Sequence, residues 1–303
     1  MTAIGDIGGG SDRGARVEKG ESGESGESRA AAQDTGTLGK ALAVLDLVVN
    51  ADVPLRFTDI HALSRQPRGT LHRHLSHLVQ EGLLFQRADL AYEPGLRLLA
   101  FAHRAWSRND LRRIARPHLD RLHAETGETV HLGVLRKTEI IYLDKVESRQ
   151  TVRMESQIGR VSPAYCTGLG KAALSALSPA RLEASLAAMS YHPFTANTHR
   201  SKGSLVADLD RIREKGYAID AEEHEVEIRC VAAPVTTGDG GDSAATGNRA
   251  YQRGVIGGIS VTGPAYRVTL GQLEAWSGLV KDVANAIAHD AAVGLGPVSI
   301  GDM

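Results

Sequence analysis

Apolar residues recur every three or four positions in the N-terminal part of the sequence, a spacing typical of amphipathic helices. The first such stretch predicts a helix over 38–49. A short second helix is expected after Thr58, a residue suited to an N-cap, and a third from position 69 or 70 to Gly82, a residue suited to ending it. Runs at 83–87 and 90–93 then predict two short strands. Three helices followed by a small hairpin indicate a winged helix-turn-helix.

Helical and strand patterns are mixed in the rest of the chain. Amphipathic helices are predicted over 96–106 and 111–125, and Pro117 should kink the second helix or mark its true start. Beyond them we expect a hairpin over 130–146, helices over 170–177, 179–189 and 204–215, core strands over 226–235 and 255–261, and a terminal helix around 273–287. This mixture predicts an α+β fold whose second domain is an α/β domain.

The length of 303 residues suits two domains. The first 34 residues repeat Glu, Ser and Gly and cannot bury enough apolar area to fold, so they are predicted to be disordered. A Gly-, Asp- and Ala-rich stretch at 236–248 is predicted to be a flexible loop. The expected organisation is a tail over 1–34, the winged helix-turn-helix over 35–95, a linker helix over 96–110, the second domain over 111–293 and a C-terminal tail over 294–303.

The charge is distributed unevenly. A formal net charge of −1 gives no general attraction to nucleic acid, so a DNA-binding surface has to be a local basic patch. Between Pro54 and Arg87, five arginines stand against two carboxylates, which gives a local charge of +3. The two cysteines argue against a disulfide scaffold and fit a reducing cytoplasm. Because no apolar run is long enough for a membrane span or a signal core, we expect a cytoplasmic protein with no membrane partner.

The basic patch includes the second helix of the helix-turn-helix, the helix that such motifs lay in the major groove. An arginine can bind a guanine edge with two hydrogen bonds, and a threonine can contact a phosphate or a thymine methyl group. The alternative is a three-helix packing unit with a solvated basic face. The residues expected to contact double-stranded DNA are Arg68, Gly69, Thr70, His72, Arg73 and His74 of this helix and Arg87 of the hairpin.

Neither a metal site nor an enzyme active site is predicted. His72, His74 and His77 are spaced so that the first two lie on different faces of a helix, a poor arrangement for one metal ion. A nucleophile pair would need a cysteine beside a histidine, and nothing in the sequence places a base beside either cysteine. Since no phosphate-binding glycine motif or nucleophile elbow is present, we expect no catalytic residue, no metal and no cofactor.

Many separate segments, in one order, resemble the IclR family of bacterial regulators. The resemblance implies a GAF-like effector-binding domain behind the winged helix-turn-helix, and a homodimer or tetramer that binds palindromic operator DNA. It also implies control by a small-molecule effector, with repression of a catabolic operon as the commoner mode. The segments that carry the resemblance are 57–60, 67–75, 92–95, 126–132, 168–172, 216–220, 222–223, 229–235 and 259–264.

The sequence departs from the family pattern at several positions. Gly69 and His74 stand where the family usually has Ser and an apolar residue, and Arg65-Gln66 replaces the common Gly-Leu of the turn. Glu227 replaces a usual Gly beside the expected pocket, where an extra carboxylate could alter ligand choice. The loop at 236–248 is also longer than usual.

The resemblance implies an effector pocket in the second domain. The implied residues are Met154, Gly168, Leu169, Asp220, Ile228, Cys230, Ser260 and Thr262. The glycines precede a predicted helix whose free N–H groups suit a carboxylate, and Ser260 and Thr262, two apart on a strand, share one face. We therefore expect a small organic acid or sugar acid as effector. The alternative is that the glycines are turn residues, Cys230 and Ser260 are ordinary core positions, and the acidic run after Asp220 is a solvated face.

Overall fold

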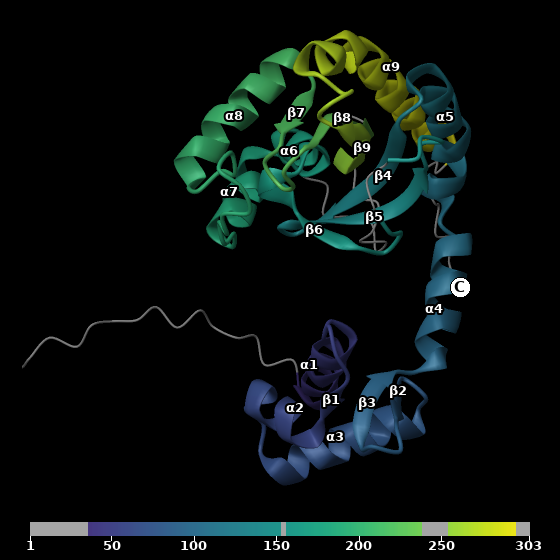
Figure 1. Cartoon of the computed structure of the whole chain (residues 1–303), viewed down its shortest axis with the longest axis vertical. Coiled ribbons are helices and arrows are strands. Elements are labelled where there is room, and N and C mark those ends of the chain that lie inside the picture. The colour runs from purple at the N-terminus through teal and green to yellow at the C-terminus, as the bar shows by residue number, and fades with distance from the viewer. Residues whose placement is uncertain (1–35, 153–155, 238–253, 295–303) are drawn as a thin grey trace, which may run out of the picture. The chain divides into compact units, whose positions relative to one another are not determined.

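The computed structural model describes residues 36–152, 156–237 and 254–294, and the chain divides into two compact units, Met1–Leu98 and Leu99–Met303 (Figure 1). The predicted tail over 1–34, nearly all of the predicted tail over 294–303 and most of the loop over 236–248 lie outside the described residues. The division between the units falls inside the predicted linker helix. Each unit is described by itself below.

The N-terminal unit is a three-helix bundle with a small antiparallel sheet. Its elements are α1 Gly36–Val49, β1 Leu55–Arg56, α2 Phe57–Ser64, α3 Arg68–Gln80, β2 Leu84–Gln86 and β3 Ala91–Pro94, and the strand order is β1-β3-β2. Val44 and Val48 of α1, Ile60 of α2, and Leu71 and Leu75 of α3 form its core. The predicted winged helix-turn-helix is confirmed, and β1 adds a strand that the sequence pattern did not predict.

Two helix starts differ from the predictions. The N-cap of α2 is Arg56 rather than Thr58, because the helix already begins at Phe57. The Asp59 carboxylate reaches back to accept the Arg56 N–H at 2.9 Å, so the capping carboxylate comes from inside the helix. The third helix begins at Arg68, directly after Pro67, which brings Arg68 into the first turn of the helix.

Two helices connect the sheets along the chain, α4 Leu96–Ser107 and α5 Asp110–Thr126. No side chain of α4 is buried among the residues that the structure describes. The Asn109 side chain caps α5 by accepting the Arg112 N–H at 2.9 Å. Pro117 therefore lies inside α5 and does not mark its start, which excludes one of the two roles predicted for it.

The C-terminal unit is built on one six-stranded antiparallel sheet of order β6-β5-β4-β9-β8-β7. Its strands are β4 Thr129–Arg136, β5 Glu139–Val146, β6 Val161–Pro163, β7 Ala218–Ala221, β8 Ile228–Thr237 and β9 Gly254–Pro264. Its helices after α5 are the 3-10 turn Ala164–Cys166, α6 Gly168–Ser175, α7 Pro179–Ala187, α8 Lys202–Lys215 and α9 Leu270–Gly294. The predicted hairpin is β4 and β5, and the sequence pattern missed β6 and β7 as it missed β1.

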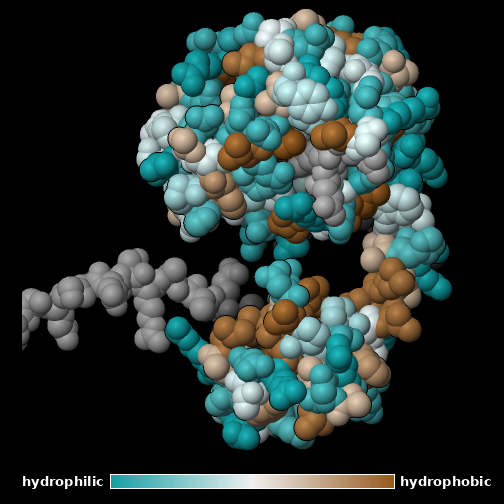
Figure 2. Space-filling view, in the orientation of Figure 1, coloured by the Kyte–Doolittle hydropathy of each residue, from teal (hydrophilic) through white to brown (hydrophobic). Residues whose placement is uncertain are grey.

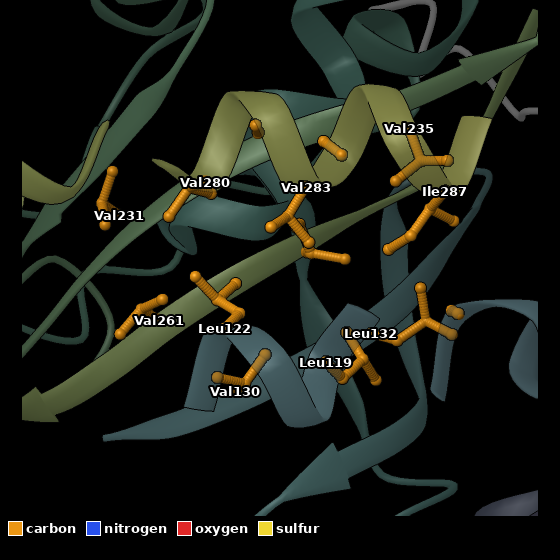
Figure 3. Packing of buried hydrophobic residues seen from close by; sticks show 14 of the residues in the cluster. Leu119, Leu122, Val130, Leu132, Val231, Val235, Val261, Val280, Val283 and Ile287 are labelled. Atoms are coloured by element: carbon orange, nitrogen blue, oxygen red, sulfur yellow. The ribbon is translucent and has the colours of Figure 1, made fainter. Parts of the chain in front are cut away.

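Helices cover both faces of this sheet. On one face, Val280, Val283 and Ile287 of α9 pack with α5 against valines of β8 and β9 (Figure 3). On the other face, α6, α7 and α8 form a separate apolar cluster that includes Ala232. Alternation along β8 serves both layers, since Val231 belongs to the first cluster and Ala232 to the second. The predicted fold class, a winged helix-turn-helix followed by an α/β domain, is confirmed. Within the described residues, no helix combines the length and the apolar character that crossing a bilayer requires.

Candidate functional site

The outer face of α3 is basic and exposed. Arg68, Gly69, His72 and Arg73 are exposed there, and Thr70 is half-buried at the edge. The Arg68 guanidinium lies 5.3 Å from the centre of the Phe57 ring, which supports it against α2. Leu71, Leu75 and Leu78 occupy the opposite face and are buried in the core. Ser76 and His77 extend the exposed face by a turn and were not among the predicted DNA contacts.

The side chain of His74 does not belong to this face, which corrects its prediction as a DNA contact. His74 is 2% exposed, and its Nδ1 lies 2.9 Å from Oε1 of Gln66. The same Gln66 side chain donates to the carbonyl of Lys40 at 3.0 Å, so His74 takes part in holding α1 against α3. Burial lowers the pKa of His74, and neighbouring Arg73 lowers it further, so the ring is neutral. The physical reason is its helical position between Leu71 and Leu78, on the buried stripe.

Arg87 lies in the wing but is already paired. Its guanidinium contacts Glu93 at 2.7 Å and Asp89 at 3.3 Å while its side chain stays 44% exposed. A phosphate that contacts Arg87 would therefore meet two exposed carboxylates beside the guanidinium.

A pocket in the C-terminal unit opens between the N-terminus of α6 and the strands β5, β7, β8 and β9. Its lining residues are Tyr142, Thr167, Gly168, Leu169, Asp220, His224, Glu225, Ile228, Cys230, Ser260 and Thr262. Every predicted pocket residue is in this set except Met154, which lies outside the described residues. The structure thus brings together residues that lie far apart in the sequence.

Strand register explains the polar wall of the pocket. Asp220 of β7 pairs with Cys230 of β8, and Cys230 pairs with Thr262 of β9, so the three side chains form one row across the sheet. Ser260 stands two residues before Thr262 on the same face, with 3.4 Å between the two hydroxyl oxygens. Ser260 and Thr262 are 2% and 4% exposed, so both hydroxyls are buried.

The helix α6 supplies the opposite wall. It begins at Gly168, so the glycines form its first turn rather than preceding it, and its N-cap Thr167 accepts the Gly170 N–H at 3.2 Å. A Cβ on Gly168 would lie 2.5 Å from the Cys230 sulfur, and one on Gly170 would lie 2.3 Å from the Ala164 carbonyl oxygen. The first of these close approaches brings the helix N-terminus against the strand that carries Cys230.

The sequence did not indicate Tyr142, Thr167, His224 and Glu225 as pocket residues. Tyr142 is 7% exposed, and burial raises the pKa of its phenol to about 12, so it is a neutral donor. Burial likewise lowers the pKa of His224, which leaves a neutral ring. His224 and Glu225 could have been predicted as pocket residues from their nearness in sequence to Asp220. They lie in the acidic run that the alternative interpretation treats as a solvated face.

Buried charges lie directly behind the pocket. The ammonium of Lys171, 1% exposed, donates to Asp208 at 2.7 Å, to the Ile219 carbonyl at 2.8 Å and to the Glu223 carboxylate. His199, Asp208 and Glu223 place ligand-type atoms within 4.8 Å of one another, as a metal site would. The Lys171 ammonium pairs with both carboxylates, and Arg211 pairs with Asp208 at 2.8 Å, so the cluster is an ion-pair network in which a metal ion would compete with resident cations.

The two cysteines are poorly suited to nucleophilic chemistry. Both are buried and free. Burial raises the pKa of Cys166 to about 12 and also raises that of Cys230, so both remain thiols at neutral pH. His131 instead hydrogen-bonds the Ser156 hydroxyl at 2.8 Å.

Comparison with known proteins gives the same domain order. The model of the IclR helix-turn-helix domain matches residues 37–88, and the model of the bacterial transcriptional regulator IclR C-terminal domain matches residues 103–289. The HTH-type transcriptional regulator XynR of Escherichia coli is 36% identical over 65% of this chain and 78% of its own length. The acetate operon repressor of Salmonella typhimurium is 29% identical over 77% of this chain and 81% of its own length.

A solved structure agrees with these relatives. The Thermotoga maritima IclR structure shares 30% identity, covers 84% of this chain and 97% of its own, and superposes with a TM-score of 0.58. The family models match both the helix-turn-helix and the domain that holds the pocket. The chain therefore belongs to the IclR family of bacterial transcriptional regulators and is a DNA-binding regulator rather than an enzyme.

Proposed function

We propose that this regulator is a homodimeric repressor that binds a palindromic operator through α3 and responds to a small carboxylate or sugar acid in the pocket. The observation that carries the DNA-binding surface is the division of α3 into two faces. Its leucines and His74 face the core, and its arginines face outward. That arrangement leaves a helix free to enter a major groove while the rest of the unit supports it.

The proposed contacts divide by chemistry. Arg68 and Arg73 suit guanine edges, Thr70 a phosphate or a thymine methyl group, and His72 either a base or a phosphate. Gly69 is exposed and has no side chain, so the DNA backbone can approach α3 closely there. Arg87 is proposed to contact a flanking phosphate, with Glu93 and Asp89 beside it.

The effector half of the proposal rests on the pocket. Ser260, Thr262 and the first residues of α6 line one cavity, where hydroxyl groups and the N-terminus of a helix offer neutral donors. These groups suit the carboxylate and hydroxyl oxygens of a small acid. We propose that Met154, in the family position, completes the set. The repressor role is supported by the acetate operon repressor among the relatives.

The homodimer is supported by an exposed apolar face on the N-terminal unit. Leu38, Leu42 and Val49 of α1 are 72%, 44% and 42% exposed. Hydrophobic side chains gather over α1 on the visible face of this unit (Figure 2). Apolar side chains grouped in this way mark interaction surfaces, and a two-fold pair of units would match the symmetry of a palindrome. The proposed place of action is the cytoplasm, where operator DNA is accessible.

A gel shift with the DNA upstream of the regulator's own gene tests the proposal. Replacing Arg73 by Ala should weaken binding by about 1–3 kcal/mol, because a base contact from the first turns of α3 is lost. Arg121→Ala, on the surface of α5, removes the same charge elsewhere and should leave affinity unchanged. Equal affinities for the Arg73 variant and the wild type at fixed salt would refute the assignment of α3.

A further inference from the structure

Among the residues that the structure describes, no lysine or arginine lines the pocket. The ionisable groups of the described lining are the carboxyl groups of Asp220 and Glu225, the imidazole of His224, the phenol of Tyr142 and the thiol of Cys230. Arg160 lies outside the wall, 3.9 Å from Glu225 at the rim. Within this described lining, an anionic ligand would meet two carboxyl groups and no compensating positive side chain. Its recognition depends on neutral donors and on the protonation of these carboxyl groups.

Asp220 is the carboxyl group inside the pocket. It is 6% exposed, and its Oδ1 accepts the backbone N–H of Glu223 at 2.7 Å. Its Oδ2 has no hydrogen-bond partner among the side chains and backbone that the structure describes. Lys171, whose charge acts on Asp220, donates its three N–H groups to Asp208, Ile219 and Glu223 instead. Asp220 is thus a buried carboxyl group without a charged donor, and one of its oxygens is left for the pocket.

Several titratable groups face Asp220 from the surrounding elements. They are Lys171 of α6, Tyr142 of β5, Cys230 of β8, Cys166 of the 3-10 turn, and Glu223 and Glu225 of the segment after β7. Burial is the main cause that raises the pKa of Asp220, to about 7, and the charge of Glu223 adds to it. The Glu223 amide and the Lys171 charge act in the opposite direction but do not cancel these effects.

We propose that Asp220 is held as a neutral carboxylic acid whose O–H donates a hydrogen bond to an anionic oxygen of the effector. The pocket then binds a carboxylate through a neutral carboxylic acid rather than through a positively charged side chain. This inference rests on the proposed function only in taking the pocket as the effector site. When Asp220 is ionised, binding requires one proton from solvent to join its Oδ2, and release of the effector returns that proton.

The direction of the pH dependence follows from this proton. Below about pH 7, Asp220 already carries the proton, so effector affinity changes little with pH. Above that value, the competent form becomes scarcer, and apparent affinity for an anion falls roughly tenfold for each further pH unit. By linkage, a bound anion must in turn raise the pH at which Asp220 loses its proton.

Carbon-13 NMR of the full-length protein, labelled at the aspartate side-chain carboxyl, tests the proposal with acetate as the probe anion. One aspartate signal should titrate near pH 7, and it should be missing in Asp220→Asn. Adding excess sodium acetate should raise this midpoint, while acetamide or sodium chloride at matched ionic strength should not. Glu225→Gln, the matched change at the other pocket carboxyl, should keep the signal and lower its midpoint slightly, since the Glu225 charge raises the pKa of Asp220.

Two results would overturn the proposal. The first is a wild-type spectrum in which every aspartate titrates below about pH 5, the ordinary range for this residue. This measurement does not depend on the folding of any variant. The second is an Asp220 titration midpoint near pH 7 that acetate does not change. That result would show that Asp220 does not donate a hydrogen bond to the anion. Operator binding by the same sample is a separate measurement, so failure of the proposed regulator function is seen independently of the state of Asp220.

Discussion

Gly168 and Gly170 open the same helix turn but lack side chains for different reasons. At position 170, an added Cβ would meet the Ala164 backbone, with its carbonyl oxygen 2.3 Å away. At position 168, the nearest atom would be the Cys230 sulfur at 2.5 Å, at the end of a side chain that can rotate. Gly170 is therefore required by the packing of α6 on the turn before it, and Gly168 by the shape of the pocket.

We predict that Gly170→Ala destabilises the C-terminal unit by about 1–3 kcal/mol, because the added methyl group forces the helix away from a backbone that cannot yield. Thermal denaturation measures this as a lowered melting temperature. Gly203→Ala on α8 is the matched control, since a Cβ there meets nothing within 4 Å. Its melting temperature should equal or slightly exceed that of the wild type. If both variants melt with the wild type, the close approach at Ala164 does not constrain the fold.

How far single residues could be predicted depended on the type of signal. Ser260 and Thr262 share a face by strand alternation, which is local in the sequence. Tyr142 could not be predicted in the same way, because only the pairing of distant strands brings β5 to the pocket. His74 could have been predicted as buried, because it follows Leu71 by three residues and precedes Leu78 by four. The sequence interpretation instead gave more weight to the polar ring of histidine and predicted a DNA contact.

At the scale of elements, strand β5 joins the pocket to the linker helix. Tyr142 lines the pocket, and the next residue, Leu143, accepts the indole N–H of Trp106 at 2.8 Å. Asp144 then holds Arg112, at 3.1 Å, and the Arg112 guanidinium lies 3.5 Å from the centre of the Trp106 ring. A displacement of β5 by a ligand would therefore reach the end of α4 through direct contacts.

We predict that Trp106→Phe loosens α4 without unfolding the sheet. An aromatic ring stays for Arg112 to cover, while the hydrogen bond to Leu143 and part of the ring surface are lost, at a cost of about 1 kcal/mol. Hydrogen exchange should show faster exchange of the α4 amides, while the amides of β4 and β9 keep their protection. Trp276→Phe, at the other tryptophan of the chain, makes the same chemical change on α9 and should leave α4 unaffected. Equal α4 exchange in both variants would show that Trp106 does not anchor the linker.

Elements were predicted best where they were long. The amphipathic patterns of α1, α4, α5 and α9 identified those helices, because several turns repeat the same burial. Strand β1 has two residues, Leu55 and Arg56, and alternation cannot be recognised over that length. Pro117 suggested a helix boundary that the structure does not have. The helix α5 begins further upstream, where Asn109 caps it, and the packing of Leu111 and Leu119 stabilises the whole helix.

At the scale of the whole molecule, charge and assembly are linked. A chain with a net charge of −1 has to bind DNA through its local excess of arginines on the N-terminal unit. One such unit presents one recognition helix, and its few phosphate and base contacts give limited affinity. Two units joined by the apolar face of α1 would double those contacts on a palindrome and raise affinity through effective concentration.

The assembly can be tested by placing a charge on that face. We predict that Leu42→Glu converts the proposed dimer to a monomer and lowers operator affinity at least about tenfold, because a carboxylate cannot be buried in an apolar interface without a partner. Light scattering after size exclusion measures the mass, and a gel shift measures binding. Val226→Glu puts the same charge on an apolar residue that is 67% exposed in the C-terminal unit, and it should change neither. The structure of the N-terminal unit should survive in both variants, since Leu42 is 44% exposed and lies outside the core around Val44 and Val48. A Leu42 variant that remains a dimer and binds its operator like the wild type would move the interface away from α1.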